Sequence, residues 1–133
     1  MKQRPVLQGI VLPGDQYGRS IGVPTINLDP TLWPAVLQPG VYAASVQHAD
    51  KTYGGALYFG PRLIKNETNN VLEVTLFDFA GDLYGQEVRV EVRDFIRPPI
   101  DFSADEVGET QMKQQIDLDV AQIQHRLARD SGQ

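Results

Sequence analysis

The chain has 133 residues, enough for one domain that buries its own core, and we expect a single domain over residues 1–133. The absence of cysteine excludes disulfides, thiolate metal sites and a catalytic thiol, and the net charge of −5 argues against a nucleic-acid partner. Because the sequence has no apolar run long enough for a bilayer and no signal peptide, we expect a cytoplasmic protein without membrane contact.

The first half of the chain predicts short strands separated by loops. Residues 6–12 form an apolar run that is closed by Pro13 and Gly14, which indicates a first strand. Residues 14–28 are predicted to be a loop. Residues 31–39 admit a covering loop or a short helical turn, and Pro34 favours a loop that contains a turn. Trp33 in this loop is expected to cover the mouth of the fold.

Four further stretches predict an antiparallel sheet. Residues 40–47 and 53–59 flank a polar turn and read as a hairpin. Residues 71–79 are rich in β-branched and aromatic side chains, as strands are. In residues 86–96, Val88, Val90 and Val92 alternate with charged residues, which predicts one dry face and one wet face.

The pattern changes to a helix near the C-terminus. Ser103 and Glu106 have the spacing of a capping box, and the helix is predicted firmly from Thr110 to Arg129. Its apolar residues fall on one stripe: Met112, Ile116, Val120, Ile123 and Leu127. Five or six short strands with one terminal helix predict a small antiparallel barrel that the helix closes at one end.

Residues 14–28 carry the strongest chemical signal. Gly14, Gly18 and Gly22 are spaced four apart, so that the backbone can approach a ligand closely, and Arg19 adds a permanent charge. Thr25 and Asn27 then supply neutral oxygen ligands. This combination suits a phosphate chain that carries a magnesium ion, and therefore predicts an enzyme that uses a nucleotide.

Glu73 is the candidate proton acceptor. In residues 71–78 it shares one face with Thr75 and Phe77, while Leu72, Val74 and Leu76 take the other. Such a carboxylate is either a solvated group or a positioned base. Phosphoryl transfer needs positioning, a metal ion and a proton acceptor, and the chain offers a candidate for each. It has no Walker motif and no protein-kinase signature, so a kinase of this kind belongs to an unusual class.

At residues 17–28, YGRSIGVPTINL, the sequence resembles the opening motif G-x-G-R-x-L-G-x-P-T-A-N-L of riboflavin kinases. The resemblance continues through PGVYA at 39–43, LEV at 72–74, DLYG at 82–85 and FIRP at 95–98. It departs at Ile26, where the family has alanine, and at residues 60–63, which lack the usual Pro-Thr-Phe. The resemblance implies a mainly β fold: a six-stranded antiparallel Greek-key barrel with a C-terminal α-helix.

The resemblance also implies the site. Thr25 and Asn27 would hold Mg²⁺, and Glu73 would take the proton from the 5′-hydroxyl of riboflavin as it attacks ATP. Arg97 would belong to a flap over the flavin, or would only anchor the bend before two prolines. The residues expected to bind the nucleotide or the flavin are Gly14, Tyr17, Gly18, Arg19, Gly22, Pro24, Thr25, Asn27 and Arg97.

The implied activity is a Mg²⁺-dependent riboflavin kinase with ATP/ADP and riboflavin/FMN as partners. We expect it to act as a monomer, standing alone without an adenylyltransferase module, so that it stops at the mononucleotide. Two alternatives stay open. One is a barrel that binds flavin without catalysis, and the other is a related kinase with a different nucleotide or small alcohol.

Overall fold

The computed structural model describes residues 4–13, 25–61, 69–100, 103 and 105–131. Within these residues the elements are six strands, one short 3₁₀ helix and one long α-helix. In chain order they are β1 (Val6–Ile10), β2 (Thr25–Leu28), η1 (Pro30–Leu32), β3 (Gly40–His48), β4 (Lys51–Pro61), β5 (Asn70–Leu76), β6 (Glu87–Arg97) and α2 (Glu106–Ser131).

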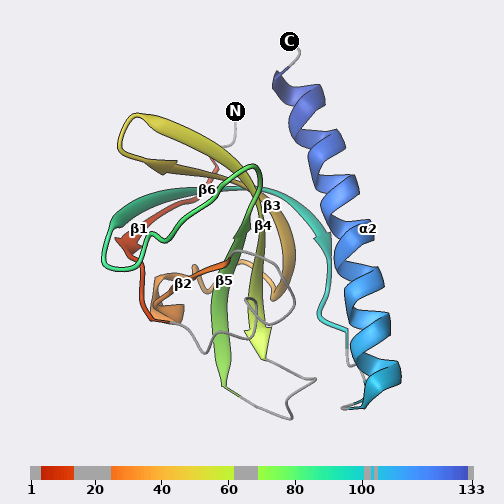
Figure 1. Cartoon of the computed structure of the whole chain (residues 1–133). Coiled ribbons are helices and arrows are strands. Elements are labelled where there is room, and N and C mark those ends of the chain that lie inside the picture. The colour runs from red at the N-terminus through yellow and green to blue at the C-terminus, as the bar shows by residue number, and fades with distance from the viewer. Residues whose placement is uncertain (1–3, 14–24, 62–68, 101–102, 104, 132–133) are drawn as a thin grey trace.

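The six strands form one antiparallel sheet in the order β1-β6-β3-β4-β5-β2. β3, β4 and β5 are neighbours in sequence and in space, and β6 returns beside β3, which is a Greek-key arrangement. The sheet curls into a half-barrel (Figure 1). Its two edges approach each other where Leu12 donates a backbone hydrogen bond to the carbonyl of Asn27, at 2.8 Å. The predicted fold is therefore confirmed.

The main core lies on the inner face of the curled sheet. Each strand contributes every second residue to it, because side chains alternate between the two faces of a strand. On β6 the buried residues are Val88, Val90 and Val92, as the alternation predicted. Trp33, which follows η1, stacks on Phe59 with ring centroids 4.8 Å apart and is only 8% exposed. Trp33 is thus a member of the main core.

Helix α2 packs on the outer face of the sheet, against β3 and β4, and Figure 1 shows it standing beside the half-barrel. Ile123 is fully buried there, in a second apolar cluster with Val41 and Ala43, and Leu127 packs against the same cluster. The predicted stripe thus packs against the protein, but the helix covers an outer face rather than closing one end. No helix in the described part of the chain is both long enough and apolar enough to span a membrane.

Two local predictions are wrong. Thr25–Leu28 is strand β2 rather than loop, because pairing with β5 and the bridge to Leu12 hold it extended. Helix α2 begins at Glu106, and its cap is Asp105 rather than Ser103. The carboxylate of Asp105 accepts a hydrogen bond from the backbone N–H of Gly108 at 2.8 Å and another from the Ser103 hydroxyl at 2.7 Å.

Candidate functional site

The centre of the candidate site is a pair of residues on β2 and β5. Asn27 and Glu73 are direct partners in the antiparallel register of these strands. Ile26 and Leu28 are buried in the core, so Asn27 faces the outer side of the sheet. Leu72 and Val74 are buried in the same way, so Glu73 shares that outer face. Directly opposite Cβ atoms lie about 5 Å apart, so one small ligand can contact both side chains.

Thr25 precedes Asn27 by two residues and therefore stands on the same face of β2, where both are partly exposed. A hydroxyl and an amide oxygen are hard, neutral ligands. They suit Mg²⁺, which keeps several waters and takes its remaining ligands from phosphate oxygens. Among the residues whose positions are described, no three or more acidic or histidine side chains form a cluster that could hold a metal ion. A Mg²⁺ ion at this place would take its ligands from Thr25, Asn27 and the substrate phosphates.

The backbone around Asn27 is held from both sides. On one side it is paired with Glu73 of β5, and on the other its carbonyl accepts the N–H of Leu12. Leu12 lies just before residues 14–24 and Thr25 just after them, so the chain enters and leaves that segment beside Asn27. The predicted nucleotide-binding residues Gly14, Tyr17, Gly18, Arg19, Gly22 and Pro24 lie outside the described residues.

Tyr58 of β4 is the neighbour of Glu73 on the other side, and the sequence did not single it out. It lies directly opposite Glu73 in the β4–β5 register and packs against the outer apolar cluster beneath α2. Burial raises the pKa of its phenol to about 12, while Arg97 and Glu73 act on that pKa in opposite directions. The only available signal was the alternation of β4, which places Tyr58 between the inward-facing Leu57 and Phe59.

These residues belong to one row that crosses the sheet. In the registers of the neighbouring strands, Arg97 of β6 lies opposite Val41 of β3, Val41 opposite Tyr58, Tyr58 opposite Glu73, and Glu73 opposite Asn27. Strands are spaced about 4.8 Å apart, so three spacings put the Arg97 backbone roughly 14 Å from that of Glu73. Arg97 is therefore at the far end of the row, under α2.

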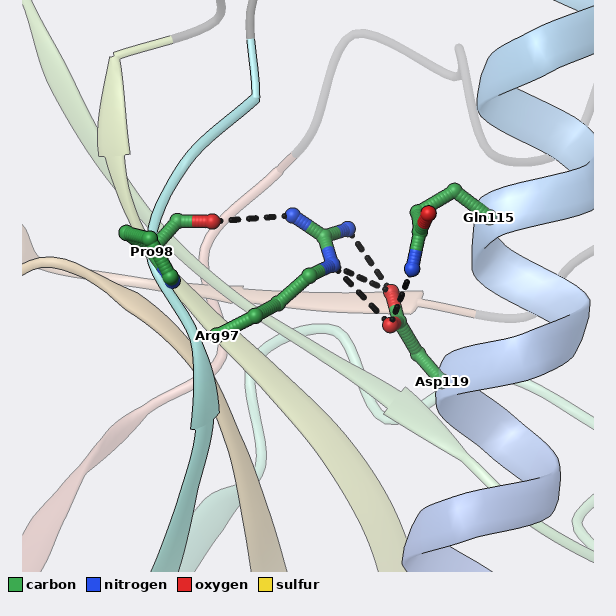
Figure 2. Close-up of polar contacts among 4 residues, drawn as sticks. All are labelled: Arg97, Pro98, Gln115 and Asp119. Atoms are coloured by element: carbon green, nitrogen blue, oxygen red, sulfur yellow. Dashed lines mark hydrogen bonds and ion pairs between the residues drawn. The ribbon is translucent and has the colours of Figure 1, made fainter.

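Figure 2 shows the contacts of the Arg97 side chain with Asp119 and Pro98. Its guanidinium grips the carboxylate of Asp119 on α2, with Nε 2.9 and 3.0 Å from the two oxygens and a second nitrogen at 2.7 Å. The remaining nitrogen donates to the carbonyl of Pro98 at 3.1 Å, and Gln115 donates to Asp119 at 3.0 Å. Arg97 thus ties the end of β6, and the bend at Pro98, to the helix.

The outer face therefore holds an oxygen-rich pair on β2, a carboxylate on β5 and an aromatic hydroxyl on β4. Such a face can hold a metal-bound phosphate at Thr25 and Asn27 and can take a proton at Glu73, one strand away. Glu73 is partly exposed, so that a substrate can reach it. At the other end of the row, Arg97 is paired with Asp119 and holds the end of β6 against α2.

The sequence is similar to riboflavin kinases over nearly all of its length. A family model described as Flavokinase: Riboflavin kinase matches residues 1–127. The bifunctional riboflavin kinase/FMN adenylyltransferase of Mycoplasma pneumoniae is 32% identical over 125 residues, which are 94% of this chain and 44% of that protein. The RNA-binding riboflavin kinase RibR of Bacillus subtilis is 32% identical over 114 residues, 84% of this chain and 48% of that protein. The chain thus spans less than half the length of these relatives.

Two solved structures share the fold. A protein of Streptococcus pneumoniae, named a macrolide-efflux protein, has a TM-score of 0.73 at 31% identity, over 89% of this chain and 38% of that chain. Riboflavin kinase from Trypanosoma brucei has a TM-score of 0.54 at 22% identity, over 92% of this chain and 82% of that chain, and this likeness concerns the fold alone. Given the match of the family model from residue 1 to residue 127, the chain belongs to the riboflavin kinase family.

Proposed function

We propose that this chain is a Mg²⁺-dependent riboflavin kinase, which transfers the γ-phosphate of ATP to the 5′-hydroxyl of riboflavin and releases FMN and ADP. The observation that carries the proposal is the pairing of Asn27 with Glu73 on the outer face of β2 and β5. In this proposal Asn27 contacts the metal-bound phosphate and Glu73 contacts the attacking alcohol, and their places on adjacent strands support such a division of roles. Membership of the riboflavin kinase family supports the choice of substrates.

In this mechanism Glu73 accepts the proton of the 5′-hydroxyl while that oxygen forms a bond to the γ-phosphorus. The bond between the γ-phosphorus and the bridging oxygen breaks, and ADP leaves with the electron pair. Thr25 and Asn27 would hold the Mg²⁺ that the triphosphate carries, and the sequence predicts that the glycine-rich residues 14–22 wrap the nucleotide. A bound Mg²⁺ would neutralise part of the phosphate charge during the transfer.

Arg97 has a structural part in this proposal. Its ion pair with Asp119 holds the end of β6 and the Pro98 bend against α2, and these segments would border the flavin. The guanidinium has five N–H groups, of which three are used by Asp119 and Pro98, so a direct contact with the flavin would use one of the other two.

The test is to incubate the purified chain with riboflavin, ATP and MgCl₂ and to separate the flavins by chromatography. We expect FMN and ADP in equal amounts. Riboflavin that binds tightly without consumption of ATP would instead favour a non-catalytic flavin-binding barrel. Transfer to another alcohol, or only from another nucleotide, would indicate a related kinase.

A further inference from the structure

The hydroxyl of Tyr58 has a fixed direction. It donates a hydrogen bond to the carbonyl of Pro61, the last residue of β4. The ring lies over Gly60, where an added Cβ would come within 2.8 Å of the Tyr58 oxygen and 3.2 Å of its Cζ, and within 3.4 Å of Pro99. Gly60 also has a φ of +150°, which L side chains rarely adopt. Gly60 therefore leaves room for the phenol, and the hydrogen bond to Pro61 directs the ring along the strand.

The Tyr58 oxygen can only accept a further hydrogen bond. A phenol has a single proton to donate, and here that proton is given to the Pro61 carbonyl. Burial raises the pKa of the phenol to about 12, so that the group keeps its proton and adds no charge beside Glu73. What the side chain offers to a ligand is therefore an oxygen with its lone pairs, held near the end of β4 on the strand next to the candidate base.

A polyol is the kind of ligand that fits such an oxygen. The acceptor alcohol must place its reacting hydroxyl at Glu73, and Tyr58 lies directly opposite Glu73 on the neighbouring strand. The hydroxyl on the next carbon of the alcohol would then lie on the side of the site where Tyr58 stands. Such a hydroxyl donates a hydrogen bond, and the Tyr58 oxygen is prepared to accept one.

We infer that Tyr58 is a specificity-determining residue of the acceptor site, whose phenol oxygen accepts a hydrogen bond from the ribityl 4′-hydroxyl next to the reacting 5′-hydroxyl. The inference rests on the proposed function, because it needs Glu73 to face the 5′-hydroxyl. It goes beyond that function by naming the group that distinguishes a polyol from a simple alcohol at this position.

The test compares riboflavin with 4′-deoxyriboflavin in the whole chain and in Tyr58→Phe, which keeps the ring and removes the oxygen. Flavin fluorescence titration gives the Kd for each flavin, and the kinase assay gives kcat/KM. For the wild-type chain we expect riboflavin to be preferred about five- to tenfold, the range of one hydrogen bond to a neutral group. In Tyr58→Phe the preference should fall below about twofold, with the KM for MgATP unchanged.

Tyr53→Phe is the matched control, because Tyr53 is also on β4 but packs toward the main core, edge-on to Phe79. It should keep the wild-type preference. A Tyr58→Phe variant that weakens both flavins equally, or that keeps the preference, would overturn the inference. So would a wild-type chain that binds both flavins equally well, whatever the variant does. A chain that binds both flavins but transfers no phosphate would overturn the proposed function, while the two Kd values would still decide the role of Tyr58.

Discussion

Asn27 and Glu73 lie directly opposite each other on β2 and β5, and both side chains stand on the outer face of the sheet. The pair is formed by residues that are far apart in sequence and is held by the hydrogen-bonded ladder between the two strands. The bridge from Leu12 to Asn27 fixes the other side of β2. A ligand that contacts one of the two side chains is thereby brought to the other, and the proposed chemistry depends on this.

The role of Asn27 predicts a change in metal dependence. Asn27→Ala removes an oxygen ligand but leaves the backbone pairing of β2 in place. We expect the Mg²⁺ concentration for half-maximal activity to rise by about tenfold or more, since even the loss of an outer-shell partner commonly costs that much. Activity against MgCl₂ concentration measures it. Asn70→Ala is the control, because Asn70 is exposed at the start of β5. An unchanged Mg²⁺ requirement in Asn27→Ala would remove this residue from the metal site.

The pairing of Arg97 with Asp119 predicts a large effect on stability. Their side chains are only 16% and 6% exposed, so Asp119→Ala leaves a guanidinium mostly buried without its carboxylate. We expect the free energy of unfolding to fall by about 3 kcal/mol. The double replacement of Arg97→Met with Asp119→Leu should recover most of this loss, because no unpaired charge remains.

Urea unfolding monitored by the fluorescence of Trp33, the single tryptophan, measures these changes. Arg89→Met serves as the control, because Arg89 is exposed on the same strand and should change the free energy of unfolding little. A loss for Asp119→Ala no larger than that of the control would show that the ion pair does not hold α2 to the sheet.

The raised pKa of Tyr58 predicts a pH dependence in the alkaline range. The phenol ionises near pH 10.0 in the unfolded chain and near pH 12 in the folded one, because burial disfavours the charged form. Between these pH values the unfolded state loses a proton that the folded state keeps, so the free energy of unfolding falls as the pH rises. Below pH 10.0 the group is neutral in both states and contributes no slope.

Urea unfolding at several pH values above neutrality measures this slope. In Tyr58→Phe the phenol is absent, so the fall should be shallower than in the wild-type chain. Burial also raises the pKa of Tyr42, and this contribution is common to both proteins. Identical slopes would mean that the Tyr58 phenol is no better shielded in the folded chain than in the unfolded one.

The sequence predicted those features that depend on neighbours along the chain. The face that Glu73 shares with Thr75 follows from the period of two in residues 71–78, because burial of Leu72 and Val74 leaves one orientation. The pattern of short strands and one terminal helix predicted a small antiparallel barrel, and the resemblance to a family specified the six-stranded Greek-key form. Strand β2 was missed because four residues after a glycine-rich segment carry little periodicity, and its conformation comes from its partners in the sheet.

Contacts that depend on strand register or join distant parts of the chain could not be predicted from local sequence patterns. Tyr58 meets Glu73 only because β4 and β5 pair in one register, which no local pattern specifies. Arg97 on β6 pairs with Asp119 on α2, which lies 22 residues later in the sequence, and no local pattern links the two. The helix cap is Asp105 rather than Ser103. The sequence could not decide between them, because both residue types can accept hydrogen bonds from the first N–H groups of a helix.

The most direct test of the proposed chemistry is the rate of FMN formation by Glu73→Gln at saturating riboflavin and MgATP, beside the wild-type chain. The amide keeps the size of the side chain but cannot accept the proton. We expect kcat to fall by about 10²- to 10⁴-fold while the Kd for riboflavin stays within about twofold of the wild-type value. Glu87→Gln, on the exposed start of β6, should leave kcat unchanged. A wild-type kcat in Glu73→Gln would contradict the assignment of Glu73 as the base.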